Sequence, residues 1–282
     1  MAPRCSLPRW AAKKAARIGV AAVSALARRG RDEGARARVL TYHRFGDAAR
    51  DPYCVGVPAF EAQMRWLAHA GLALSLDDVT ALVAGGDDAP EGGVLVTIDD
   101  GCRSTIENAL PVLRQWGIPA VVYVVVGSLG RGRGLDRDQP EDYMTWNDVE
   151  TLLATGLVTI GSHAYHHRSV ARRYATLAFD EAAGSRALLE ERLGTPVRSF
   201  AYPFGTLRDF SPATRRALAA AGYTTAFTSQ HGPLRPGLDP LELPRIKVEG
   251  GDPRWVFRTL PAGGLDPWRL IDRALTPLQH AS

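Results

Sequence analysis

Cysteine is scarce in this sequence of 282 residues. It holds three cysteines, Cys5, Cys54 and Cys102, which are widely spaced and whose odd number leaves one without a disulfide partner. This spacing fits neither a disulfide framework nor a zinc ribbon. Cysteine usage therefore leaves the redox compartment of the protein open.

Long hydrophobic runs are absent as well. No run approaches the roughly 18 apolar residues that a membrane-spanning helix needs, and no repeat of about 20 to 50 residues is evident. The apolar stretch at 18–27 has the size of the central part of a signal peptide, but it is weakly hydrophobic and Arg28 and Arg29 follow it at once. With signal-peptide cleavage as the alternative, we expect a basic helix that either contacts anionic lipid or is a solvated arm.

Positive charge is concentrated at the N-terminus. Residues 1–38 hold ten basic and two acidic side chains, a net charge of +8, and the other residues hold 24 basic and 28 acidic ones, a net charge of −4. A mildly acidic body makes nucleic acid an unfavourable partner. We predict a basic N-terminal arm or helix over residues 1–37 and one domain over residues 38–282, which is long enough to bury a core of its own.

Strand patterns alternate with helix patterns along the chain. Apolar runs typical of buried strands occupy 38–43, 94–98, 120–126, 158–161, 199–202 and 224–228. Helical periodicity occupies 60–67, 79–83, 104–116, 146–154, 179–193 and 212–221. Nearly continuous apolar strands separated by helices indicate an α/β fold with a parallel sheet, which we predict to close into a (β/α) barrel. In such barrels the chemistry lies at the C-terminal ends of the strands.

Side chains that bind metals follow two of these predicted strands. Asp99 and Asp100 end one strand, and His163 and His167 follow another. Asp100 offers an oxygen ligand, and the i, i+4 spacing of the histidines predicts that both rings lie on one face of a helical turn. Three protein ligands leave one position open for water or substrate, which is typical of a catalytic metal site. Asp99 is then free to act as a base.

Three motifs occur in order at predicted strand ends: Thr-Ile-Asp-Asp-Gly at 97–101, Ser-His-Ala-Tyr-His-His at 162–167 and Phe-Ala-Tyr-Pro-Phe-Gly at 200–205. Together they resemble the motifs of the polysaccharide deacetylases, carbohydrate esterase family 4, over roughly residues 38–250. Members of that family have a distorted, seven-stranded (β/α) barrel and use a divalent metal to remove N-acetyl groups from glycans. The resemblance implies a hydrolase of carbon–nitrogen bonds that binds one divalent metal, with Zn²⁺ as the expected ion, and acts on an N-acetylated glycan.

The resemblance also assigns roles to individual residues. It makes Asp99 the catalytic base and Asp100, His163 and His167 the metal ligands. It implies that four residues line the substrate cleft, with the backbone amide of the third holding the developing oxyanion: Tyr202, Pro203, Phe204 and Gly205. His166 is expected to face solvent or to support the ligands, with an exchange of roles with His167 as the alternative.

Two positions depart from the commonest family pattern. Ala201 stands where many members have the arginine that orients the catalytic aspartate, and Arg245 is the candidate replacement. The C-terminal Leu-x-His segment that supplies a general acid in many members is also missing, because the matching region reads Ile-Lys-Val at 246–248.

The general acid is expected at the other end of the chain. The segment Leu-Thr-Tyr-His at 40–43 resembles the one used by the circularly permuted branch of the family, which includes poly-N-acetylglucosamine deacetylases. This resemblance makes His43 the acid that protonates the departing amine. A packed, inactive His43 is the alternative, and His231, in a predicted surface loop, is then the reserve acid.

Two other functions fit the same residues. The first is a deformylase or another carbon–nitrogen amide hydrolase on the same barrel, and the second is a carbohydrate-binding protein without catalytic activity. We expect the protein in the cytoplasm, associated with a membrane through its basic N-terminal arm, with export to the periplasm or cell surface as the alternative.

Overall fold

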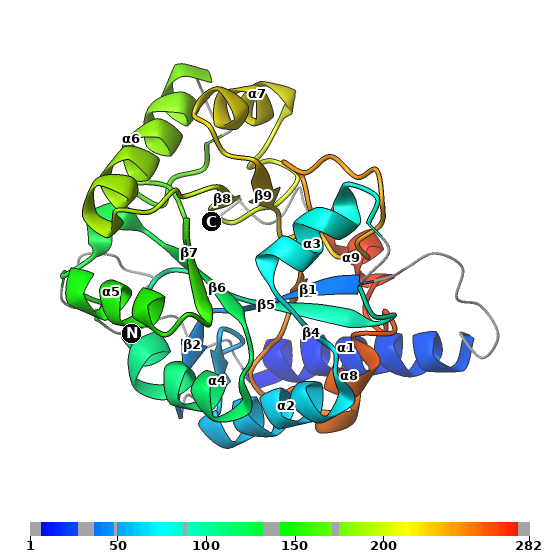
Figure 1. Cartoon of the computed structure of the whole chain (residues 1–282). Coiled ribbons are helices and arrows are strands. Elements are labelled where there is room, and N and C mark those ends of the chain that lie inside the picture. Colours follow the sequence, from blue (N-terminus) through cyan, green and yellow to red (C-terminus); the bar gives the residue numbers. More distant parts are fainter. Residues whose placement is uncertain are drawn as a thin grey trace.

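A curled sheet of parallel strands forms the centre of the molecule, and helices surround it (Figure 1). The computed structural model describes residues 7–27, 37–47, 50–86, 89–131, 142–170 and 175–275. The main path of the sheet holds seven strands, in the spatial order β10 (Ile246–Lys247), β1 (Ala37–Tyr42), β5 (Gly93–Ile98), β6 (Ala120–Val124), β7 (Val158–Ser162), β8 (Ser199–Ala201) and β9 (Thr225–Phe227).

The two ends of this sheet approach each other. Phe227 of β9 pairs in parallel with Leu243, in the segment that leads into β10. Neighbouring strands along the path are parallel, as expected where helices connect successive strands. The predicted α/β fold is thus confirmed as a curled half-barrel of seven parallel strands, in keeping with a distorted (β/α) barrel. Three short strands lie off this path: β2 (Arg44–Phe45), β3 (Cys54–Val55) and β4 (Ala73–Leu74).

The helices begin and end close to the predicted positions. In chain order they are α1 (Leu7–Ala27), α2 (Val57–Ala70), α3 (Leu76–Val83), the π-helical turn η1 (Thr105–Ala109), α4 (Leu110–Trp116), the 3₁₀ turn η2 (Val126–Ser128), α5 (Trp146–Ala154), α6 (Ala175–Leu193), α7 (Pro212–Ala220), α8 (Arg254–Thr259) and α9 (Trp268–Leu275). Ser75, Thr145 and Ser211 begin α3, α5 and α7 with capping boxes, because each side chain accepts from the amide three residues on. β10, α8 and α9 were not predicted, since segments of two to eight residues carry little periodicity.

The two faces of strand β5 pack against different parts of the molecule. Val94, Val96 and Ile98 belong to the large cluster shared with the outer helices, whereas Leu95 joins a smaller cluster with Tyr123. Because side chains alternate along a strand, Thr97 and the next odd position, Asp99, follow Leu95 onto this second face. The period of two therefore directs Asp99 toward the inside of the curled sheet.

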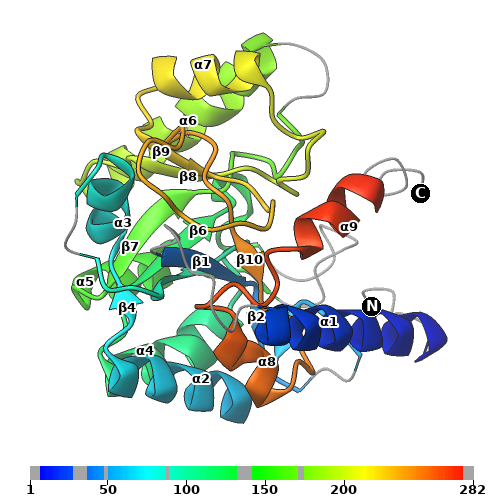
Figure 2. The same cartoon turned by 90° about the vertical axis from the view of Figure 1, so that its right-hand side faces the viewer.

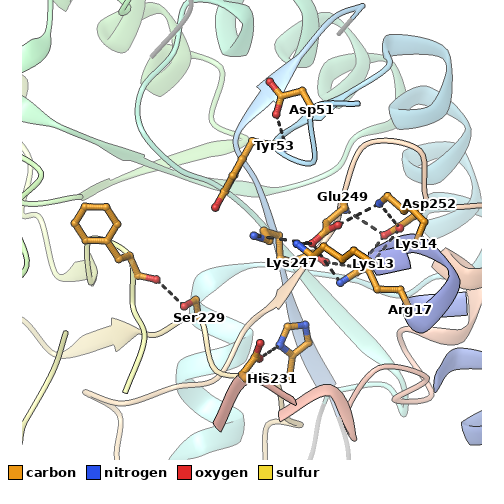
Figure 3. Close-up of polar contacts among 12 residues, drawn as sticks. Lys13, Lys14, Arg17, Asp51, Tyr53, Ser229, His231, Lys247, Glu249 and Asp252 are labelled. Atoms are coloured by element: carbon orange, nitrogen blue, oxygen red, sulfur yellow. Dashed lines mark hydrogen bonds and ion pairs between the residues drawn. The ribbon is translucent and has the colours of Figure 1, made fainter. Parts of the chain in front are cut away.

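The basic helix α1 lies against the body of the protein beside α8 (Figures 1 and 2). Its Lys14 ammonium lies 3.2 Å from Glu249 and 2.8 Å from Asp252, and its Arg17 guanidinium lies 2.8 Å from Asp252 (Figure 3). Lys14 and Arg17 are 5 % and 1 % exposed. The expectation of a solvated arm is therefore wrong for Lys14 and Arg17, because two acidic residues distant in sequence bind them inside the structure. Contact of the arm with lipid stays a prediction.

The remaining expectations about the arm have different outcomes. Within the described ranges, no helix has the length and hydrophobicity that crossing a membrane requires. The predicted domain boundary between residues 37 and 38 stays a prediction.

We expect Glu249→Gln to lower the free energy of unfolding by about 3 to 5 kcal/mol, because the buried cations around it lose their carboxylate. Burial raises the pKa of Glu249, but Arg17, Lys247, Lys13 and Lys14 lower it far more, to well below its ordinary value of 4.5. A carboxyl whose pKa is lowered by folding stabilises the protein above its unfolded pKa, and this stabilisation is lost as the pH falls. Urea unfolding at pH 7 and at lower pH measures both effects.

The matched control for this experiment is Glu107→Gln. Glu107 forms an exposed ion pair with Arg103, in which the Arg103 Nε lies 2.7 Å from the Glu107 carboxylate. This variant should leave the unfolding midpoint unchanged at pH 7, because exposed ion pairs contribute little. Equal losses of stability in the two variants would contradict the role given to Glu249.

Candidate metal centre and active site

Backbone strain is concentrated at the ends of β5, β7 and β8. In the described ranges, five non-glycine residues have a positive φ, and four of them follow these strands: Asp100 (74°), Ala164 (65°), His167 (56°) and Phe204 (61°). Such conformations are costly for residues with a Cβ and persist where the surrounding structure enforces them. Their clustering at neighbouring strand ends marks this edge of the sheet as the functional site.

Asp99 is held by a buried arginine. Both terminal nitrogens of Arg245 donate to its carboxylate, each at 2.7 Å, and the Arg245 Nε donates to the Thr228 carbonyl at 2.9 Å. Asp99 and Arg245 are 3 % and 2 % exposed. Burial raises the pKa of Asp99, but the positive charge of Arg245 and the nearby His163 lower it by more than burial raises it. The pKa of Asp99 therefore lies below its ordinary value. The structure thus brings Arg245 to the position in which the sequence predicted a replacement arginine.

Asp100, His163 and His167 converge beside this pair. The Nε2 atoms of both histidines lie 3.5 Å from Asp100 Oδ1, and one ligand atom from each residue lies within 4.8 Å of the others. Ligand atoms about 2.1 Å from a tetrahedral metal lie about 3.4 Å apart, so these side chains fit one divalent ion. The sequence-predicted ligand set is therefore assembled by the fold.

A hydrogen bond to the backbone orients His163. Its Nδ1 lies 2.8 Å from the carbonyl oxygen of Ala201, to which it donates. This bond fixes the tautomer in which Nε2 has a free lone pair directed at the site, as is usual for metal-binding histidines. Ala201, which replaces the family arginine in sequence, thus supports the site through its backbone.

The segment from His163 to His167 is not the helical turn that the spacing predicted. It is an irregular loop in which Ala164 and His167 adopt left-handed conformations. The buried Glu181 of α6 accepts hydrogen bonds from the amides of Tyr165 (3.0 Å) and His166 (2.8 Å). The two positive φ angles bend this loop so that the ring centroids of His163 and His167 lie 4.9 Å apart, although the segment is not helical.

His166 and Glu181 support this loop. His166 Nδ1 lies 2.8 Å from the Glu181 carboxylate, so its ring binds the helix α6 instead of joining the metal ligands. His166 is thereby the supporting residue that the sequence predicted. Glu181 itself was missed, because a single acidic residue on a helix carries no signal that it holds a loop.

His43 directly follows β1, and its ring interacts electrostatically with Asp99 and Asp100. Burial lowers its pKa to about 4, although Asp100 and Asp99 oppose this shift. Its ring lies 4.9 Å from that of Tyr53, at 78°, and its Nδ1 is buried without a hydrogen-bond partner among the described residues. The structure therefore brings His43 to the site as a neutral imidazole near pH 7.

His231 is not the surface residue that was expected. It is 7 % exposed, and its Nδ1 lies 2.6 Å from the Asp272 carboxylate of α9 (Figure 3). The sequence around His231 gives no sign of this contact, because its partner Asp272 lies 41 residues further along the chain. His231 therefore belongs to a contact between this loop and α9.

The turn at 202–205 separates into buried and exposed residues. Tyr202 is fully buried and donates to the Leu241 carbonyl at 2.9 Å, so its predicted place along the substrate cleft is wrong. Pro203 is also buried. Phe204 is 49 % exposed, and its ring lies 4.9 Å from that of His167. Gly205 is required, because a Cβ there would lie 2.6 Å from the Ser229 amide nitrogen. The role of the Phe204 amide in an oxyanion hole stays a prediction.

These features define a member of the polysaccharide deacetylase family. The family's sequence model, described as polysaccharide deacetylase, matches residues 86–226, half of the chain, and the chain belongs to this family. It is thereby a hydrolase of carbon–nitrogen bonds other than peptide bonds, of the type that removes N-acetyl groups from glycans, as the motifs predicted.

Individual relatives extend over most of the chain. The poly-β-1,6-N-acetyl-D-glucosamine N-deacetylase of Staphylococcus aureus is 24% identical over 206 residues, which is 70% of this chain and 68% of that protein. The structure of IcaB from Ammonifex degensii is 28% identical, with a TM-score of 0.69 over 82% of this chain and 98% of that one. The deacetylase PplD of Streptococcus pyogenes, 18% identical, shares the fold with a TM-score of 0.70 over 80% of this chain and 98% of that one.

We expect the purified protein to bind about one divalent metal per chain, and His163→Ala to lose it, because two remaining ligands hold a metal weakly. Elemental analysis after dialysis and reconstitution with Zn²⁺ measures the stoichiometry. His166→Ala is the control and should keep its metal, since His166 binds Glu181. A metal retained by His163→Ala and lost by His166→Ala would reverse the ligand assignment.

Proposed function

We propose that this protein uses a divalent metal, with Zn²⁺ the expected ion, to remove the N-acetyl group from an amino sugar of a polysaccharide, oligosaccharide or lipid-linked glycan. The observation that carries this proposal is the convergence of Asp100, His163 and His167 beside the paired Asp99 and Arg245. The relative that acts on poly-β-1,6-N-acetyl-D-glucosamine supports N-acetylated hexosamines as the class of substrate.

Asp99 acts as the base in this proposal. Asp100, His163 and His167 would hold the divalent metal, which when bound would lower the pKa of a water molecule and polarise the acetamide carbonyl. Arg245 holds both oxygens of Asp99, which fixes the orientation of the carboxylate that accepts the water proton. The proton leaves the water as its oxygen bonds to the carbonyl carbon.

His43 acts as the acid. When the bond between carbon and nitrogen breaks, the amine leaves with a proton, without which it is a very poor leaving group. Because the pKa of His43 is about 4, the resting imidazole is neutral near pH 7. The proton that His43 delivers therefore reaches it during turnover: Asp99 takes it from the attacking water, it passes to the His43 ring, and the leaving amine receives it.

We expect His43→Gln to lower kcat for an N-acetylated oligosaccharide by about 10²- to 10⁴-fold, and to lower the hydrolysis of an activated acetate ester far less. A phenolate that leaves from such an ester needs no proton, whereas an amine does. Asp99→Asn is the matched variant and should lose both activities, because both reactions need the base. Acetate release and phenolate absorbance measure the two reactions.

The outcomes of this experiment separate the competing functions. Equal losses on amide and ester in His43→Gln would remove His43 as the acid. Formate release in preference to acetate would favour the deformylase, and glycan binding without any turnover, unchanged after metal removal, would favour the binding protein.

We propose further that the outer face of α1 contacts an anionic membrane surface. Of the nine exposed residues described on α1, none is charged: Pro8, Ala11, Ala12, Ala15, Ala16, Gly19, Val23, Ala25 and Leu26. Val23 and Leu26 are each 66 % exposed, and the basic residues Arg28, Arg29 and Arg31 follow them in the sequence. An apolar helix face followed by arginines is suited to the interface of a bilayer that carries negative charge.

The double substitution of Val23 and Leu26 by Asp should lower binding to vesicles of anionic lipid by about 10-fold or more, because two apolar side chains leave the interface. Co-sedimentation with anionic and with neutral vesicles measures this. The substitution Ala84→Asp, on the unrelated helix end at α3, adds charge elsewhere and should leave binding unchanged. Unchanged binding of the double variant would overturn the contact. The cytoplasmic location predicted from the sequence, with export as its alternative, stays a prediction.

A further inference from the structure

Strand β10 brings a second basic side chain to the face that carries Arg245. Lys247 pairs with Thr41 of β1 in the parallel register. Because side chains alternate along an extended chain, Lys247 lies on the same face as Arg245, two residues nearer the C-terminal end of the strand. That end of the sheet is the one at which Asp99 and His43 lie. Lys247 thus stands at the rim of the proposed active site.

The side chains of Lys247 and Tyr53 lie next to each other (Figure 3) and form a wall beside the ring of His43, the proposed acid. The Lys247 Nζ lies 4.2 Å from the centroid of the Tyr53 ring, and that ring lies 4.9 Å from the ring of His43. The Lys247 side chain is 24 % exposed and Tyr53 is 44 % exposed. A ligand in the site can therefore reach both.

The acidic residues around Lys247 are bound by other cations. Glu249, 4.0 Å from Lys247, lies closer to Lys13 (2.7 Å), Lys14 (3.2 Å) and Arg17 (3.6 Å). Asp252, the other acid of this cluster, is bound by Lys14 and Arg17, each at 2.8 Å. Four cations thus share two carboxylates, and Lys247 lies farther from the Glu249 carboxylate than the other three do.

Two further acids near this wall also have partners. Asp51 forms an ion pair with Arg44 and accepts from the Tyr53 amide, and Asp99 is bound by Arg245. Burial lowers the pKa of Lys247, but Tyr53 and Glu249 raise it, and the net pKa lies above its ordinary value. Lys247 therefore carries a full positive charge that faces the site.

We propose that Lys247 and Tyr53 form a subsite for an anionic group of the glycan, a carboxylate or a phosphate close to the acetamide that is hydrolysed. The exposed Tyr53 ring offers a flat apolar surface to a pyranose, and the ammonium pairs with the negative substituent. This inference rests on the proposed deacetylation and narrows its substrate from N-acetylated glycans in general to acidic ones.

The test compares three N-acetylglucosamine oligosaccharides of equal length: a neutral one, one with a carboxylated sugar and one with a phosphomonoester. Binding is measured by titration calorimetry in the metal-loaded Asp99→Asn variant, so that it does not depend on turnover. We expect at least one charged oligosaccharide to bind about 10- to 100-fold more tightly than the neutral one, as a hydrogen bond to a charged group predicts. Which charged one binds more tightly distinguishes a carboxylate from a phosphate.

Variants of Lys247 then assign the preference. Adding Lys247→Met to Asp99→Asn should reduce the ratio of charged to neutral affinity to about one, and Lys247→Arg should restore it. Lys13→Met is the matched control, because Lys13 contacts the same Glu249 but lies on α1, and it should keep the preference. If Lys247→Met does not fold, the test is made on Asp99→Asn alone. Its ratio of charged to neutral affinity must then fall as the salt concentration rises from about 0.05 to 0.5 M.

Failure of this inference differs from failure of the proposed function. Equal affinity for the three oligosaccharides, or a preference that Lys247→Met retains, would overturn the subsite and leave deacetylation intact. Tight binding of the charged oligosaccharide without acetate release by the wild-type protein would support the subsite and contradict the proposed reaction.

Discussion

The paired hydrogen bonds between Arg245 and Asp99 are the interaction on which the site depends. They join the end of β5 to the start of β10, and both side chains are almost completely buried. A buried carboxylate without this partner would take up a proton or carry a large desolvation cost. The pair therefore fixes the ionised form of the proposed base and also the position of β10, which closes the curled sheet beside β1.

Electrostatic support for the site extends outward from β10 to the N-terminus. Lys247 follows Arg245, and Glu249 and Asp252 follow in turn and bind the inward face of α1. A helix that is strongly basic in sequence thus has no charged residue among its described exposed positions, because Lys14 and Arg17 bind acidic side chains inside the protein. Because Lys13, Lys14 and Arg17 of α1 lie closer to Glu249, the positive charge of Lys247 is only weakly compensated at the rim of the site.

Strain at the strand ends has a structural explanation. Asp100, His167 and Phe204 each adopt a left-handed conformation, and each presents its side chain to the same small region. Parallel strands that end at one edge deliver their loops side by side, but a regular loop would direct few of these side chains inward. Glu181, the Ala201 carbonyl and the close approach of Gly205 to Ser229 hold the strained loops in place.

The sequence by itself determined the strands and helices of the curled sheet, the family, and the residues Asp99, Asp100, His163 and His167, because these depend on local periodicity and on short motifs. It also pointed to Arg245 and His43, through what the usual motifs lacked. Only the tertiary structure decided that the histidine loop is not helical, that Tyr202 is buried and Phe204 exposed, that His231 pairs with Asp272, and that Lys14 and Arg17 of α1 face inward. Each of these depends on a partner far away in the sequence, and the energy of burying a ring or a charge is set by that partner, which local patterns do not encode.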